Sequence, residues 1–139
     1  MRILFDSSAI YKRYDAERGH ARVMQLGQQA SEVVAAAHSR TEVTSALNRQ
    51  RHDGVLSQDD YTRILGIVQR EFAEFVRYPL DASVELLANA AMELARLRSA
   101  DALQLATAQL AQVDLFVTAD PRLAKAALAV GLKTELIEA

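Results

Sequence analysis

The sequence contains no cysteine, and this absence excludes whole classes of chemistry. Without cysteine the chain has no disulfide, no thiolate nucleophile and no sulfur-ligated zinc. The three histidines, His20, His38 and His52, show none of the usual helical pair spacings of a zinc site. A metal site in this chain would therefore have to consist mainly of oxygen ligands.

Proline, glycine and long apolar runs are also scarce. Two prolines and five glycines are too few for a domain boundary, and no repeat, Gly-rich phosphate loop or dinucleotide fingerprint is present. No stretch approaches the ~20 apolar residues that cross a bilayer. The first residues carry a charge too early for a signal peptide. We therefore expect a soluble cytoplasmic protein with one domain over residues 1–139.

Neither sign of charge dominates the chain. Sixteen basic and eighteen acidic residues give a net charge of −2, which is not the profile of a protein that binds nucleic acid by charge alone. Without the four acids discussed next, the remainder has a net charge of about +2. A negative pocket in a mildly positive protein suits a phosphate substrate that meets metal ions.

Short apolar runs alternate with segments of helical periodicity, which predicts a three-layer α/β/α fold with a mainly parallel central sheet. The predicted strands are Arg2–Phe5, Glu32–Ala36, Phe75–Tyr78, Val113–Thr118 and Lys133–Ile137. The predicted helices are Ser7–Tyr14, Glu17–Gln29, His38–His52, Gln58–Phe75 with Ser57 as its cap, a helix capped by Asp81 that runs to Leu97, Ser99–Gln112, and Pro121–Val130.

Four acidic residues stand at strand exits or at the starts of predicted helices. Asp6 and Asp120 follow two of the strands, and Glu42 and Asp101 lie near the first turns of their helices. In open α/β sheets the functional crevice lies beyond the carboxyl ends of the strands, so both aspartates would face it. Each acid alone is also explained by helix capping or by the helix dipole, as for Asp101 in a helix capped by Ser99.

The joint placement of the four acids favours a shared site. Like charges within ~4 Å repel by kilocalories, so a fold keeps them together only with protons or cations. Mg²⁺ and Mn²⁺ suit an all-carboxylate site. Sequence spacing alone does not establish that the four side chains converge, and the capping explanation stays open at this point.

Four sequence blocks, taken together, resemble the PIN-domain nuclease family. They are ILFDSSAI at 3–10, TEVTSAL at 41–47, LRSADALQLATA at 97–108, and VTAD at 117–120 followed by Arg122 and Leu123. The blocks stand in the family order and span essentially the whole chain, so the resemblance implies a single PIN-like nuclease domain over 1–139. The compact length resembles the VapC-type toxins of toxin–antitoxin pairs. Gln104 departs from the pattern, because many relatives carry His there, and this puts a substrate contact in question.

The resemblance implies a ribonuclease that uses Mg²⁺, or Mn²⁺, at a catalytic quartet of Asp6, Glu42, Asp101 and Asp120. Asp6 and Asp101 would bind the metal directly, and Glu42 and Asp120 would bind a second ion or hold its waters. Such an ion activates water for in-line attack on phosphorus, and the products would carry 5′-phosphate and 3′-hydroxyl ends.

Hydroxyl and basic residues near the quartet have implied supporting roles. The hydroxyls of Ser7 and Thr118 would orient a ligand or a water, or else serve only as helix-start residues. Arg98 and Arg122 are the predicted RNA contacts. They belong to a larger set that is close in sequence to the acids: Lys12, Arg13, Arg40, Arg98, Arg122 and Lys125.

The resemblance also implies three partners: an RNA substrate, a second copy in a homodimer, and a cognate antitoxin that wraps the toxin near its site. Such a toxin would inhibit translation. For Tyr11 and Tyr14, packing against a partner helix is favoured over stacking on a base. Apolar residues beyond one buried stripe support an interface: Ile10, Tyr11, Tyr14, Ile64, Leu65, Ile67 and Val68.

Other functions fit the sequence less well. An aspartyl-nucleophile hydrolase needs a second Asp two residues after the first, where this chain has Ser8. A phosphoacceptor regulator needs an adjacent acidic pair after the first strand. A non-catalytic PIN-like module that binds RNA or protein would have lost one or more of the four acids, and all four are present.

Overall fold

A five-stranded parallel sheet forms the centre of the computed structural model, which describes residues 1–138. The strand order is β3-β2-β1-β4-β5. β1 is therefore the central strand. The next two strands in the sequence, β2 and β3, extend the sheet on one side of β1, and β4 and β5 extend it on the other side. The strands are β1 (Arg2–Phe5), β2 (Glu32–Ala35), β3 (Val76–Arg77), β4 (Leu115–Thr118) and β5 (Thr134–Leu136).

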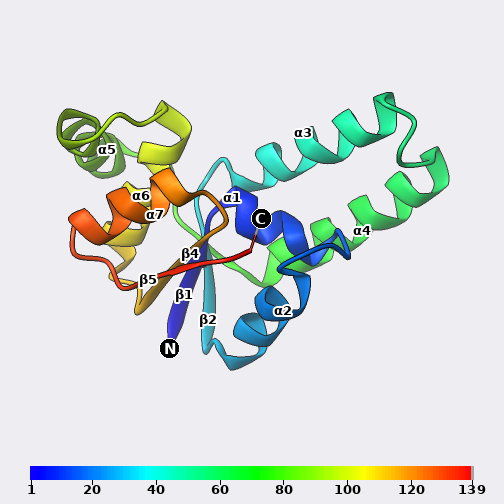
Figure 1. The fold of residues 1–139 in the computed structure, drawn as a ribbon, viewed down its shortest axis with the longest axis horizontal. Coiled ribbons are helices and arrows are strands. Elements are labelled where there is room, and N and C mark those ends of the chain that lie inside the picture. The colour runs from blue at the N-terminus through cyan, green and yellow to red at the C-terminus, as the bar shows by residue number, and fades with distance from the viewer. Residues whose placement is uncertain (139) are drawn as a thin grey trace.

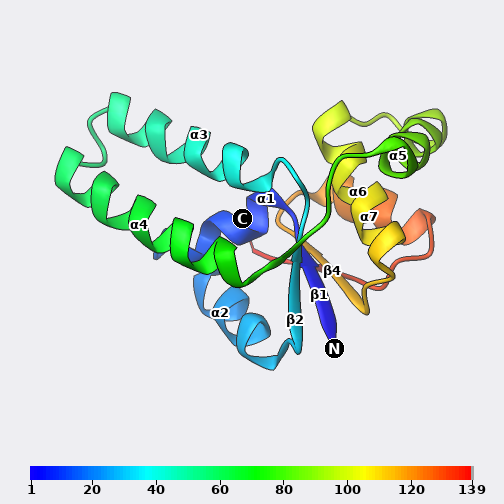
Figure 2. The ribbon, with the colours of Figure 1, turned by 180° about the vertical axis from the view of Figure 1, so that it is seen from behind.

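Helices cover both faces of this sheet, which confirms the predicted three-layer α/β/α fold. Figures 1 and 2 show α3 and α4 as a long pair that projects to one side, with α5, α6 and α7 on the other. None of the helices in the described residues is long and apolar enough to cross a membrane. The bounds are α1 (Ser7–Ile10), the 3₁₀ turn η1 (Tyr11–Arg13), α2 (His20–Gln29), α3 (Ser39–His52), α4 (Gln58–Glu74), α5 (Ala82–Leu94), α6 (Ser99–Ala111) and α7 (Pro121–Ala129).

The side chains of β1 point alternately to the two faces of the sheet, and the core is accordingly divided into two layers. Ile3 and Phe5 pack in one cluster with side chains of α1 to α4, whereas Leu4 packs in a second cluster with side chains of α6 and α7. Successive side chains of a strand point to opposite faces, so a strand that is apolar throughout is buried on both. This burial fixes β1 in the middle of the sheet, and with it the position of Asp6 at its exit.

Two helix ends differ from the sequence prediction by three residues, whereas several others differ by a single residue. The helix predicted from Glu17 begins at His20, because Gly19 has a left-handed backbone (φ 86°) and forms its N-cap. The helix predicted to reach Leu97 ends at Leu94, where the backbone of Ala95 turns extended.

The predicted caps are correct in two cases and wrong in one. The side chains of Ser57 and Asp81 accept hydrogen bonds from backbone N–H groups of α4 and α5. Ser99 does not cap α6: the N-cap is Arg98, which makes no side-chain capping bond. The side chain of Arg98 is instead directed to another partner, described below.

Most of the apolar residues that suggested an interface belong to the core of the chain itself. Ile10 and Val68 are fully buried, and Tyr11, Tyr14 and Ile64 pack against the same cluster. Only Leu65 and Ile67 of this set lie half-buried outside the core clusters. The sequence argument for a dimer is therefore weaker than the apolar count suggested.

Gly19 and Gly131 allow a matched stability test, because both have φ of 86°. A Cβ on Gly19 would lie 2.5 Å from Ile137 Cγ2 and 2.7 Å from the Glu138 carbonyl oxygen, whereas a Cβ on Gly131 meets nothing within 4 Å. We expect Gly131→Ala to cost about 1 kcal/mol from backbone strain alone. Gly19→Ala should cost about 2–4 kcal/mol, because Ile137 is buried and has to move. Urea unfolding of both variants checks this, and equal losses would contradict it.

Candidate functional site

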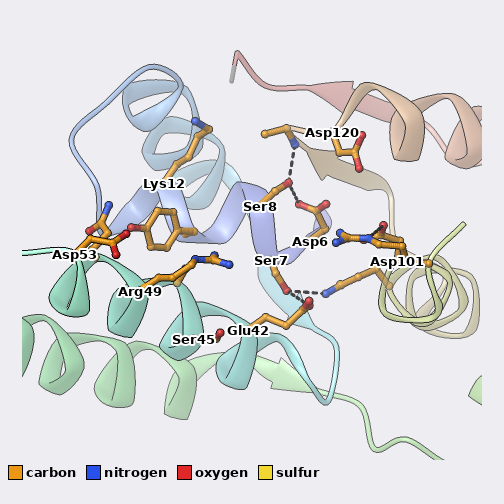
Figure 3. Close-up of a pocket in the computed structure, with 16 residues that line it drawn as sticks. Asp6, Ser7, Ser8, Lys12, Glu42, Ser45, Arg49, Asp53, Asp101 and Asp120 are labelled. Atoms are coloured by element: carbon orange, nitrogen blue, oxygen red, sulfur yellow. Dashed lines mark hydrogen bonds and ion pairs between the residues drawn. The ribbon is translucent and has the colours of Figure 1, made fainter. Parts of the chain in front are cut away.

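A cavity of about 660 Å³ opens at the carboxyl ends of β1 and β4, and all four predicted acids line it. Asp6 follows β1 and Asp120 follows β4, while Glu42 and Asp101 lie in the first turns of α3 and α6. We call these four residues the acidic centre. Figure 3 shows them toward one end of the cavity, with Lys12, Arg49 and Asp53 toward the other.

Asp6 is the most buried member, with 3% of its surface exposed. Its Oδ1 accepts hydrogen bonds from Ser8 Oγ (2.7 Å) and from the backbone N–H of Ala9 (2.9 Å), and its Oδ2 accepts one from Thr118 Oγ1 (2.6 Å). Burial raises the pKa of Asp6 to about 6, even though these donors lower it, and the charge of Asp101 raises it further. Asp6 thus caps α1 and also belongs to the acidic centre, so the two explanations are compatible.

Two hydroxyls connect Asp6 to the start of α7. Thr118 Oγ1 donates to Asp6 and accepts from the backbone N–H of Asp120 (3.0 Å), so it lies between the two aspartates. Ser8 Oγ donates to Asp6 and accepts from the N–H of Ala119 (3.0 Å). Sequence reasoning proposed Thr118 but not Ser8, whose partner is 111 residues away. Both hydroxyls restrict the orientation of the Asp6 carboxylate.

Glu42 is held by a chain of half-buried and buried polar groups. Its Oε1 accepts from Ser7 Oγ at 2.6 Å and lies 3.3 Å from His38 Nε2. Ser7 Oγ in turn accepts from Gln104 Nε2 at 3.0 Å, and the same amide nitrogen donates to Ser39 Oγ. Since the carboxylate only accepts, Ser7 has to donate to it, and Gln104 therefore has to present its NH₂ to Ser7.

Asp101 is paired with a positive charge. Arg98 Nε lies 3.1 Å from Asp101 Oδ2, and Arg98 Nη2 lies 3.4 Å from Oδ1. The pKa of Arg98 is raised by this hydrogen-bonded contact with Asp101 and by the charges of Asp101, Glu42 and Asp120. The guanidinium thus lies in the combined field of three members of the acidic centre.

The four carboxylates share a cavity but do not converge as a preformed metal cage. Across residues 1–138, no three Asp, Glu or His side chains are close enough together to hold one metal ion. Each carboxylate instead has its own partner: Thr118 and Ser8 for Asp6, Ser7 for Glu42, Arg98 for Asp101, and the N–H of Arg122 for Asp120. The convergence that the sequence suggested thus extends to one cavity but not to one coordination sphere.

A family model for the PIN domain matches residues 3–128, which include the whole acidic centre. The chain belongs to the PIN-domain family. This assignment confirms the resemblance drawn from the four sequence blocks. Among curated proteins, none matches the chain in sequence.

Solved structures with the fold of this PIN domain include toxins of toxin–antitoxin systems. VapC20 of Mycobacterium tuberculosis, a sarcin–ricin loop cleaving toxin, has a TM-score of 0.69 and 17% identity over 94% of this chain and 95% of that chain. FitAcB of Neisseria gonorrhoeae has a TM-score of 0.70 and 14% identity over 95% of each chain. VapBC2 of Rickettsia felis, bound to a promoter DNA fragment, has a TM-score of 0.71 and 10% identity over 99% of this chain and 100% of that chain.

Gln104, the departure from the family pattern, has a role inside this PIN domain. It is 1% exposed, and its NH₂ group is used by Ser7 and Ser39. Its contacts therefore lead to Glu42 through Ser7. A histidine here would add a titratable group to this network, whereas the amide of Gln104 keeps the same charge at every pH.

The six basic residues near the acids in sequence have different surroundings in the fold. Lys12 and Arg98 line the main cavity, and Arg122 lines an adjoining hollow of about 280 Å³. Arg13 is instead paired with Glu71 at 2.6 Å. Arg40 and Lys125 line neither space.

Sequence reasoning missed Arg49, which also lines the main cavity. Arg49 follows Glu42 by seven residues on α3, which is about two helical turns, so both side chains lie on one face. Ser45 and Ala46, between them on that face, line the cavity too. The helical period from Glu42 onward was the signal that would have found Arg49.

The two tyrosines also differ. Tyr11 lines the cavity, and burial together with nearby Asp15 and Glu17 raises the pKa of its hydroxyl to about 12. Tyr14 packs against the core cluster beside α4 and lines none of the cavities described. Only Tyr11 is therefore available to a ligand in the cavity.

Proposed function

We propose that this PIN domain is a divalent-metal-dependent endoribonuclease in which Asp6, Glu42, Asp101 and Asp120 bind the metal and carry the catalysis. One observation carries the proposal: four carboxylates from four separate elements line one cavity at the carboxyl ends of β1 and β4. Helix capping explains the positions of Asp6 and Asp120, but not why Glu42 and Asp101 face the same space.

The donor set suits Mg²⁺, or Mn²⁺, because all four groups are hard oxygen ligands. The Arg98 guanidinium already provides a positive charge among three of the carboxylates. Asp6 and Asp101 are the proposed direct ligands, with Glu42 and Asp120 holding a second ion or its waters. Binding a cation would require Asp101 to leave Arg98.

The chain's own residues position the carboxylates for this chemistry. Thr118 and Ser8 restrict Asp6, and Ser7 with Gln104 behind it restricts Glu42. A divalent ion, when bound, lowers the pKa of water and neutralises charge on the leaving oxygen. The proposed products carry 5′-phosphate and 3′-hydroxyl ends.

We further propose that the protein is a VapC-type toxin that inhibits translation, forms a homodimer and is held inactive by a cognate antitoxin. The fold shared with VapC20, FitAcB and VapBC2 supports a toxin and an antitoxin partner. VapC20 is described as cleaving the sarcin–ricin loop, which supports RNA as the substrate class here.

The test is cleavage of RNA by the purified chain with Mn²⁺ or Mg²⁺, in parallel with a chelator and with Asp101→Asn. We expect cleavage that the chelator abolishes and that Asp101→Asn lowers about 10²-fold, because a charged ligand is lost. The matched control is Asp59→Asn on α4, an exposed acid outside both cavities. Equal rates for the two variants would refute the assignment of Asp101.

A non-catalytic PIN-like module is the second candidate, and the Arg98–Asp101 ion pair is the observation that favours it. In such a module the guanidinium would permanently replace the cation. Calorimetric titration with Mn²⁺ separates the two, because a nuclease takes up the ion and a module of this kind does not.

A further inference from the structure

The acidic centre has basic groups on two sides. The main cavity contains Lys12 and Arg49 at the end away from the acidic centre, as Figure 3 shows. The adjoining hollow is lined by Arg96 and Arg122 and shares three lining residues with the main cavity: Arg98, Asp101 and Asp120. The two spaces therefore meet at the acidic centre, and each leads from it to positive charge.

Lys12 and Arg49 are free to bind an external anion. Neither side chain forms an ion pair or a hydrogen bond with any of the residues 1–138. Other basic residues near them are already paired, such as Arg13 with Glu71 and Arg22 with Glu135. Two unpaired cations in one cavity favour a ligand with negative charge, which the acidic centre alone would repel.

Local structure places both residues at the cavity. The backbone carbonyl of Lys12 accepts from His20 Nδ1 at 2.5 Å, and its side-chain Cδ lies against Gly19, where a Cβ would come within 2.8 Å. Arg49 is fixed by its place on α3, two turns beyond Glu42. Lys12 thus belongs to η1, which directly follows α1, and Arg49 belongs to α3, which also carries Glu42.

Tyr11 and Asp53 define the remaining walls of this end. Tyr11 is half-buried and lines the same cavity. Asp53, an exposed carboxylate one turn beyond Arg49, marks the outer limit, because it repels a further phosphate. This end of the cavity thus contains two cationic side chains, one tyrosine and, at its outer limit, one carboxylate.

We infer that a single RNA strand crosses the acidic centre, with Lys12 and Arg49 binding backbone phosphate on one side and Arg96 and Arg122 on the other. We call these four residues the strand track. The inference rests on the proposed function, to which it adds the conformation of the substrate and its contacts. A single strand is part of the inference because Tyr11, which lines the cavity, would stack only on a base that is free of a duplex.

Equilibrium binding tests the strand track separately from cleavage. The probe is a short, unstructured, fluorescein-labelled RNA whose anisotropy is measured in Ca²⁺ for the wild type, Lys12→Gln and Arg49→Gln. We expect each variant to raise Kd about three- to tenfold and to reduce the slope of log Kd against log salt by about 0.7, which is one phosphate contact. An unlabelled single strand should compete at least tenfold better than its duplex.

Lys133→Gln is the matched control, because Lys133 is exposed at the amino end of β5, away from both cavities. A wild-type Kd and salt slope in both Lys12→Gln and Arg49→Gln would overturn the track, as would equal competition by the duplex. If the wild type binds as expected but cuts no RNA with Mn²⁺, the track stands and the proposed nuclease function fails. If the wild type cuts RNA but both variants bind RNA as tightly as the wild type does, the proposed nuclease function stands and the strand track fails.

Discussion

Asp6→Asn is expected to lower the rate of RNA cleavage about 10³-fold, the largest effect of any single change in the site. Asn keeps an oxygen for Ser8 and the N–H of Ala9, so the start of α1 retains its cap. The substitution removes the negative charge and replaces the oxygen that accepts the hydrogen bond from Thr118. The loss should therefore appear in kcat and in Mn²⁺ affinity rather than in the fold. A cleavage rate within tenfold of the wild type would exclude Asp6 as a ligand.

The same change should stabilise the metal-free protein at neutral pH. The carboxyl of Asp6 has a pKa of about 6 in the folded chain and near 3.8 when unfolded, so the unfolded state releases its proton first as pH rises. The contribution of Asp6 to the stability of the wild type therefore falls by about 3 kcal/mol between about pH 4 and pH 6 and stays constant above that range. Asp6→Asn lacks this loss.

Urea unfolding in chelator, at about pH 4 and at about pH 7.5, measures the effect. We expect the stability of Asp6→Asn relative to the wild type to rise by about 3 kcal/mol between the two pH values. Added Mn²⁺ should then stabilise the wild type but not the variant, because ligand binding to the native state adds to its stability. A pH-independent difference would show that burial does not perturb this carboxyl.

Arg98→Met is expected to change two properties in opposite directions. The guanidinium contacts Asp101 at 3.1 Å and adds positive charge beside Glu42 and Asp120, so it competes with a cation for the acidic centre. Its removal should tighten Mn²⁺ binding about tenfold. The same removal should raise KM for RNA, because the side chain lines both cavities of the strand track and would contact phosphate once a cation displaces it.

Calorimetric titration with Mn²⁺ and steady-state cleavage test the two halves of this prediction. Arg96→Met is the control, since Arg96 lines only the adjoining hollow and forms no ion pair with any described residue. It should raise KM and change Mn²⁺ affinity less than threefold. Weaker Mn²⁺ binding in Arg98→Met would mean that Arg98 supports the metal site rather than competes for it.

Four sequence blocks indicated the family by resemblance, and the sequence by itself also determined the order of strands and helices and the four acidic positions. The order and the positions have a physical basis. These follow from local physics: apolar runs form buried strands, helical periods form the covering helices, and the chain order places acids at strand exits and helix starts. The boundaries at Glu17 and Leu97 were wrong because they depend on single backbone conformations, at Gly19 and Ala95.

Only the tertiary structure decided which side chains meet. The contacts of Ser8 with Ala119 and of Gln104 with Ser7 join residues 111 and 97 positions apart, and no local period encodes such contacts. The junction of the two cavities brings Asp120 to Arg98 and Asp101 from a different helix. The pairing of Asp101 with Arg98 is local in sequence, yet its effect depends on Glu42 and Asp120 across the cavity. Local pattern fixes where a residue lies on its element, whereas packing between elements fixes its neighbours, its solvation and hence its charge.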